Sequence, residues 1–207
     1  MYDFLVDLDE YFCEKYANYD KLCVLPGYRM PTMQATSTDE FGRSYSYTLP
    51  ANTMRLALQE NKAEILAELK KRIVDKGFSF SFRPLGLFKR MRYKGKKGGY
   101  KYLKEAFRRY NVSLEETQKE LDIEPEIWQN ICKGKFAPTK NTIFSLALVA
   151  HFSIEDTVAI LNGNGYEVDL SAARDVVIGY LLEKKVFSRP MMEAAFAEYK
   201  VSNLYIK

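Results

Sequence analysis

The stretch from Ser113 to Lys140 most constrains the fold of this chain, because helix start and stop residues follow one another there at short intervals. Ser113 precedes Glu116 by three residues, which is the spacing of a capping box at a helix start. Pro125 suits the first turn of a second helix, where a missing amide donor costs nothing. Gly134 is typical of a helix stop. The stretch therefore predicts two short helices joined by a tight turn, then a loop and a third helix.

Apolar residues at helical spacing continue on both sides of this stretch. They predict further helices over residues 100–110, 139–152, 154–161, 171–184 and 188–199. The helix over 139–152 is apolar nearly all round, so we expect it at the centre of its domain. The C-terminal half is therefore predicted to be all-helical.

The first half of the chain mixes helices with short strands. Residues 2–16 predict an amphipathic helix whose acidic stripe is either a solvated face or a docking surface for a basic partner. Residues 51–76 predict helix in two parts, the second of which starts at a capping box at Asn61. Prolines and glycines punctuate residues 21–50, and residues 45–49 alternate as a strand does. The alternating FSFSF at 78–82 is expected to pair with that strand, which predicts a small mixed α/β domain.

Positive charge concentrates between residues 83 and 109, where eleven lysines and arginines accompany a single acid, Glu105. Residues 85–92 predict a short basic amphipathic helix, and the KGKKGG that follows suits a flexible linker. Three interpretations remain open for this segment: a solvated linker, an arm that contacts phosphates, and an anchor on anionic lipid.

Composition narrows the functional class. The net charge of +4 is too small to indicate nucleic-acid binding by itself, and three cysteines without CxxC spacing favour a reducing compartment. No apolar run approaches the roughly 20 residues that span a bilayer, and the acidic start is unlike a signal peptide, so we expect a cytoplasmic protein. His151 is the only histidine, and no nucleophile and base pair or phosphate loop is recognisable. We therefore expect a non-enzymatic protein without metal or cofactor.

SLEETQKELDI, ICKGKFAPTKNTIFSLA and HFSIEDTVAIL together resemble the capped first helix, glycine loop and closing helices of the lambda-repressor-like helix-turn-helix family, over roughly residues 100–161. The resemblance implies an all-helical C-terminal domain, and with the patterns of the first half it predicts an α+β protein of three parts. These are an N-terminal α+β domain at 1–92, a basic Gly/Lys linker at 93–99, and an all-helical domain at 100–207, with the helix-turn-helix at 113–134 and extra C-terminal helices.

The resemblance also implies where DNA would be read. Residues 124–132 occupy the recognition-helix position, and Gln129 and Asn130 are chemically suited to adenine edges. The family prefers a small residue where Gln118 stands and a glycine where Asp122 stands. Glu124 and Glu126 place carboxylates at reading positions, which is unfavourable beside a polyanion. The candidate DNA-contacting residues are Lys94, Lys96, Lys97, Lys101, Lys104, Arg108, Gln118, Gln129, Asn130, Lys133 and Lys135.

Three hypotheses follow. In the first, the protein is a regulator that binds double-stranded DNA, holding phosphates with its basic linker and first helix. In the second, it is an adaptor that keeps a degenerate helix-turn-helix as a scaffold and binds a protein partner or forms a homodimer without DNA. The third is an enzyme whose site lies in the tyrosine-rich N-terminal domain, and the sequence supports it least.

Overall fold

The computed structural model describes residues 4–19, 34–38, 42–48, 62–75, 84–95 and 98–202. The chain divides into two compact units, residues 1–74 and 75–207. Each unit is described separately below.

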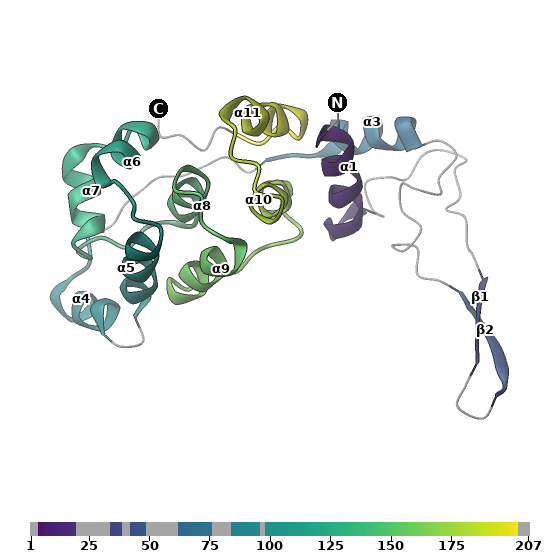
Figure 1. The fold of residues 1–207 in the computed structure, drawn as a ribbon, viewed down its shortest axis with the longest axis horizontal. Coiled ribbons are helices and arrows are strands. Elements are labelled where there is room, and N and C mark those ends of the chain that lie inside the picture. The colour runs from purple at the N-terminus through teal and green to yellow at the C-terminus, as the bar shows by residue number, and fades with distance from the viewer. Residues whose placement is uncertain are drawn as a thin grey trace. The chain divides into compact units, whose positions relative to one another are not determined.

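The first unit contains two described helices and a hairpin (Figure 1). These are α1 (Phe4–Lys15), β1 (Gln34–Thr38), β2 (Ser44–Thr48) and α3 (Lys62–Arg72). As the apolar spacing predicted, α1 buries Leu8 and Phe12, and α3 buries Ile65 and Leu69. Both helices and the strand at 44–48 are confirmed, and the first part of the helix predicted over 51–76 lies outside the described residues.

The hairpin is antiparallel, with Gln34 opposite Thr48 and Thr38 opposite Ser44. The partner that the sequence predicted for this strand, residues 78–82, lies outside the described residues.

The second unit is helical wherever the structure describes an element (Figure 1). Its helices are α4 (Leu87–Lys94), α5 (Gly99–Arg109), α6 (Leu114–Leu121), α7 (Pro125–Cys132), α8 (Lys140–Val149), α9 (Ile154–Gly163), α10 (Ala173–Glu183) and α11 (Arg189–Glu198). They match the predicted helices to within a few residues. Of the expected linker, Tyr93 and Lys94 end α4 and Gly99 begins α5, while Lys96 and Lys97 lie outside the described residues.

Helix α8 is at the centre of this unit, as its apolar sequence predicted. It buries every residue from Thr142 to Leu148 and packs against α6, α9 and α10. Ser113, Thr139 and Ser153 each accept a hydrogen bond from the backbone amide three residues later, over 3.4, 3.3 and 3.2 Å. These caps satisfy donors that would otherwise have no partner at the helix starts.

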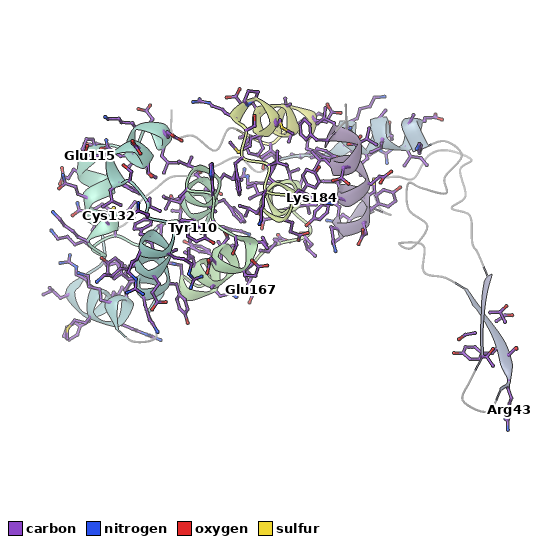
Figure 2. All side chains as sticks on the ribbon, in the orientation of Figure 1. Arg43, Tyr110, Glu115, Cys132, Glu167 and Lys184 are labelled. Atoms are coloured by element: carbon purple, nitrogen blue, oxygen red, sulfur yellow. The ribbon has the colours of Figure 1, made fainter. Side chains whose placement is uncertain are left out.

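Helices α5 and α9 run antiparallel in close contact. A Cβ atom on Gly99 would lie 2.4 Å from the Gly163 carbonyl oxygen, so only glycine fits where the two helices meet. At the other end of α5, the Tyr110 hydroxyl donates to Asp156 Oδ2 over 2.7 Å and accepts from the Ser153 amide over 2.9 Å (Figure 2). Backbone contact at one end and hydrogen bonds at the other hold α5 in place against α9.

A buried ion pair joins Asp75, the first residue of this unit, to Arg174 in α10. Arg174 Nη2 donates to both carboxylate oxygens of Asp75 over 2.7 Å, and the Ser202 amide donates to the same carboxylate over 2.9 Å. Burial acts to raise the pKa of Asp75, but the hydrogen bonds from Arg174 and Ser202 outweigh it and lower this pKa below its usual value. The carboxylate therefore stays ionised at neutral pH.

Replacing Arg174 with alanine should lower the free energy of unfolding by about 2 to 3 kcal/mol, because it leaves the Asp75 carboxylate buried without its cation. Chemical denaturation followed by circular dichroism measures this change. Lys101→Ala is the control, since Lys101 makes an exposed ion pair with Glu105 at 3.8 Å, and such pairs contribute about 0 to 1 kcal/mol. Equal losses in the two variants would contradict a structural role for the Arg174 pair.

Candidate functional site

Helices α6 and α7 are joined by a turn that their own side chains close. Asp122 adopts the left-handed conformation, with φ of 51°, and ends α6. The Gln118 side-chain amide donates to the Ile123 carbonyl over 3.0 Å. Gln118, a candidate DNA-contacting residue in the sequence, therefore uses its amide nitrogen inside the turn.

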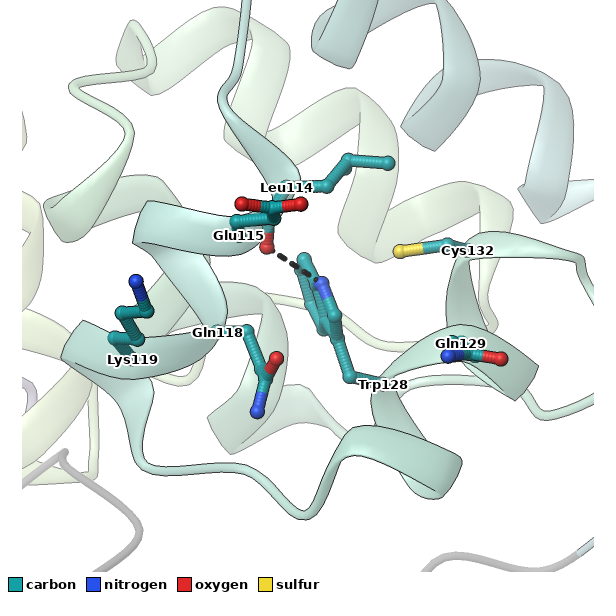
Figure 3. Close-up of a pocket in the computed structure, with 7 residues that line it drawn as sticks. All are labelled: Leu114, Glu115, Gln118, Lys119, Trp128, Gln129 and Cys132. Atoms are coloured by element: carbon teal, nitrogen blue, oxygen red, sulfur yellow. Dashed lines mark hydrogen bonds between the residues drawn. The ribbon is translucent and has the colours of Figure 1, made fainter.

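Trp128 fixes the two helices to each other and to α5. Its indole nitrogen donates to the Leu114 carbonyl over 2.8 Å, and its ring centroid lies 6.0 Å from that of Phe107 (Figure 3). Only 3% of Trp128 is exposed. The bond satisfies the one donor of a buried indole, which makes this residue the centre of the α6–α7 pair.

A cavity of about 330 Å³ opens between the two helices (Figure 3). It is lined by Leu114, Glu115, Gln118, Lys119, Trp128, Gln129 and Cys132. Burial raises the pKa of the Cys132 thiol to about 12, so the thiol is neutral at pH 7 and forms part of the apolar wall.

The sequence assigned Leu114 to the inward face of its helix, but 43% of it is exposed. The sequence contains a signal of this exposure: Leu114 stands in the first turn of α6, where no preceding turn of the helix can cover its side chain.

The surface of the α6–α7 pair is acidic. Six of its carboxylates are exposed: Glu115, Glu116, Glu120, Asp122, Glu124 and Glu126. Between Ser113 and Cys132 the only exposed cation is Lys119, and no ion pair to these six carboxylates is formed within the described residues. Their negative charge is therefore available to a partner.

The predicted basic residues are divided between two other places. Lys94 is the last residue of α4, and its side chain lies beside the C-terminal end of α7. Its Nζ is 5.6 Å from the Tyr100 ring centroid, and the Tyr100 hydroxyl donates to the Cys132 carbonyl over 2.6 Å. Lys133 and Lys135, both exposed, follow α7 directly. These three lysines thus gather at the opposite end of α7 from Glu124.

The other basic residues line one face of α5. Lys101, Lys104 and Arg108 are exposed and recur at steps of three and four, which places them on the same side of the helix. Of these, Lys101 pairs with Glu105, while Lys104 and Arg108 have no carboxylate partner in the described part of the chain. We refer to Lys101, Lys104 and Arg108 as the α5 stripe.

Gln129 and Asn130, the predicted base-reading residues, have different surroundings. Gln129 is exposed at the edge of the cavity, and its Oε1 accepts a hydrogen bond from Lys133 Nζ over 3.5 Å. Asn130 is half-buried, and its carbonyl accepts from the amides of Lys135 and Phe136 over 2.8 and 3.1 Å. The structure thus brings Gln118 and Gln129 together at one cavity and leaves the α5 stripe on a separate helix.

Within the described ranges, no group of three or more histidine, cysteine, aspartate or glutamate side chains is arranged to hold a metal ion. None of the described helices has the length and apolar character needed to cross a bilayer. No protein family, curated protein or solved structure matches this chain significantly.

Gly134→Ala should destabilise the second unit by more than the matched change Gly165→Ala. Both glycines have positive φ, +61° and +80°, which costs an alanine about 1 to 2 kcal/mol. A Cβ on Gly134 would also lie 2.9 Å from Lys94 and Tyr100 carbons, whereas one on Gly165 meets nothing within 4 Å. Thermal or chemical unfolding of both variants measures the difference. Equal destabilisation would show that Lys94 and Tyr100 do not pack on the end of α7.

Proposed function

We propose that the second unit is a non-enzymatic protein-binding module that uses a degenerate helix-turn-helix, α6–α7, as its scaffold. In this proposal the cavity and the exposed carboxylates of the same two helices, of which Glu115 lines the cavity, bind a basic segment of a partner protein that carries an exposed apolar side chain. The observation that carries the proposal is the charge of this surface, which is negative over both helices and unpaired within the described residues.

The same charge argues against duplex DNA as the ligand of this surface. DNA carries one negative charge per about 1.7 Å of its axis, and proteins bind it by neutralising phosphates with lysine and arginine. Glu124 and Glu126 are exposed at the start of α7, the end that would enter the major groove. Carboxylates there oppose a polyanion and favour a cationic partner.

The cavity supplies the apolar part of such recognition. Interfaces derive most of their binding energy from a few side chains buried in pockets, while surrounding charges steer the approach and select the partner. Leu114, Trp128 and the neutral thiol of Cys132 form the apolar lining, with Glu115 and Lys119 at its edge. A lysine- or arginine-rich segment with one leucine or phenylalanine matches both features.

A synthetic helical peptide with leucine and phenylalanine on one face and lysines on the other should bind the protein and shift the fluorescence of Trp128. Trp128 is the only tryptophan in the chain and it lines the cavity, so its emission reports occupancy. Affinity should fall with added salt, and Glu115→Lys should weaken it about tenfold, since reversal of a steering charge opposes the peptide.

Glu193→Lys is the matched control, because Glu193 is an exposed glutamate on α11 outside this surface. Peptides with the apolar residues changed to serine or the lysines changed to glutamate should not bind. An emission that stays constant at low salt, or a Glu115→Lys variant with unchanged affinity, would disprove the proposal.

A second candidate function rests on the α5 stripe. Lys104 and Arg108 lack carboxylate partners among the described residues, and with Lys101 they form a cationic line that suits the phosphate backbone of a nucleic acid. This function would be independent of the acidic pair and without base reading by Gln129.

In a salt titration with duplex DNA, each of Lys104→Glu and Arg108→Glu should reduce the slope of log affinity against log salt by about 0.9, the value for one lost phosphate contact. Fluorescence anisotropy of a labelled duplex measures this slope. Lys185→Glu, an exposed charge reversal beyond α10, should leave the slope unchanged. If the wild-type protein does not bind duplex DNA at low salt, the second candidate is eliminated.

A further inference from the structure

Helix α4 is fixed to the second unit at both ends. Before it, the Leu85 amide donates to the Lys135 carbonyl over 3.0 Å, and Pro84 forms a bridge with Phe136. Near its end, the Tyr93 ring lies 6.0 Å from the Tyr100 ring, and α4 packs on α5. The orientation of α4 is therefore set by the unit that carries it.

In this orientation the apolar side of α4 faces outward and its polar side faces the unit, which is the reverse of an ordinary amphipathic helix. Leu87, Phe88 and Met91 are 75%, 89% and 73% exposed, although they form one continuous apolar stripe. The inward side instead holds Arg90 and Tyr93, whose Nε and hydroxyl atoms are buried without a hydrogen-bond partner in the described residues. Exposed apolar surface and unpartnered buried polar groups both cost free energy. A helix held in this way presents its apolar stripe to something outside the unit.

The flanks of the stripe are cationic. Lys94 follows Leu87 on one side and Arg92 follows Phe88 on the other, while α4 contains no acidic residue. We name Leu87, Phe88 and Met91, with Arg92 and Lys94, the α4 face. It has the chemistry expected of a partner for the α6–α7 pair, namely apolar side chains that suit the cavity and cations that suit the exposed carboxylates of the two helices.

We infer that the α4 face of one copy of this chain docks on the α6–α7 cavity of a second copy. The inference rests on the proposed function, and it specifies a second copy of this chain as the partner protein. No residue of α4 lines the cavity of its own chain, so the two complementary surfaces are separate on one molecule. At about 12 Å, eight helical residues are short enough to lie along the groove between two short helices. A phenylalanine side chain fits within the 330 Å³ of the cavity.

The assembly closes if the exchange is reciprocal. In a two-fold dimer each copy inserts its α4 face into the cavity of the other, so both complementary pairs are used and no open chain grows. A membrane surface with anionic lipid would also attract the α4 face, but it would leave the cavity and the acidic surface of the α6–α7 pair unused. The second copy satisfies both surfaces together.

The test compares two variants, each altered on one side of the contact only. Phe88→Asp alters the α4 face, and the pair Glu115→Lys with Gln129→Lys alters the cavity edge. All three positions are exposed, so both variants should fold, which circular dichroism checks. Each variant alone should dimerise about tenfold or more weakly than wild type in sedimentation equilibrium. Leu170→Asp, at a 45% exposed leucine outside both surfaces, should dimerise normally.

Mixing the two variants should give a 1:1 heterodimer that is tighter than either variant's homodimer. It keeps one wild-type contact, and in the other contact the aspartate introduced on α4 meets the two lysines introduced at the cavity edge. The emission of Trp128 in wild type should change with protein concentration over the same range as the dimerisation. A dimer that persists in both variants, or a mixture that stays monomeric while wild type dimerises, would overturn the inference.

A wild-type protein that stays monomeric at its highest soluble concentration also overturns the inference, and two further measurements then separate the remaining possibilities. If the lysine and leucine peptide still shifts Trp128 emission, the protein-binding function stands and the partner is another protein. If the peptide has no effect, both proposals fail. Binding to vesicles of phosphatidylglycerol but not phosphatidylcholine, lost in Phe88→Asp, would reassign the α4 face to a lipid surface.

Discussion

The hydrogen bond from the Trp128 indole to the Leu114 carbonyl holds together the part of the molecule on which the proposed binding surface depends. It joins α6 to α7 across the cavity, while the Trp128 ring beside Phe107 joins the pair to α5. Because the bond uses a backbone carbonyl, any residue at position 114 could accept it. The leucine side chain is thereby left to line the cavity instead of holding the helices together.

The charges along α7 stabilise the helix itself, whether or not a ligand is bound. Glu124 and Glu126 lie at its start and Lys133 at its end, which complements the partial charges of the helix termini by about 0.3 to 1 kcal/mol for each charge. Beside DNA the same carboxylates would be repelled by the phosphates, which would oppose this stabilisation. In this chain, helix stability and a negative binding surface coincide, which is consistent with a cationic partner.

The elements were predictable because local chemistry decides them. The caps at Ser113, Thr139 and Ser153 and the stop at Gly134 act within one turn of helix, so their spacing in the sequence is sufficient. The inversion of α4 was not predictable, because periodicity defines an apolar stripe without saying which side packs. The decision depends on contacts with Lys135, which lies far along the chain, and with Tyr100 in the next helix. Gln118 illustrates the same limit, since its role follows from the turn geometry at Ile123.

The two proposals are linked by competition for one cavity. If the α4 face of a second copy occupies it, a partner protein must displace that copy, and the apparent affinity for the partner falls as the concentration of this chain rises. By the same linkage, the partner dissociates the dimer to the extent that it occupies the cavity. The inverted α4 then has a physical rationale beyond assembly. An apolar stripe on a fixed basic helix is shielded from other contacts in the dimer and is released only when a better ligand for the cavity is present.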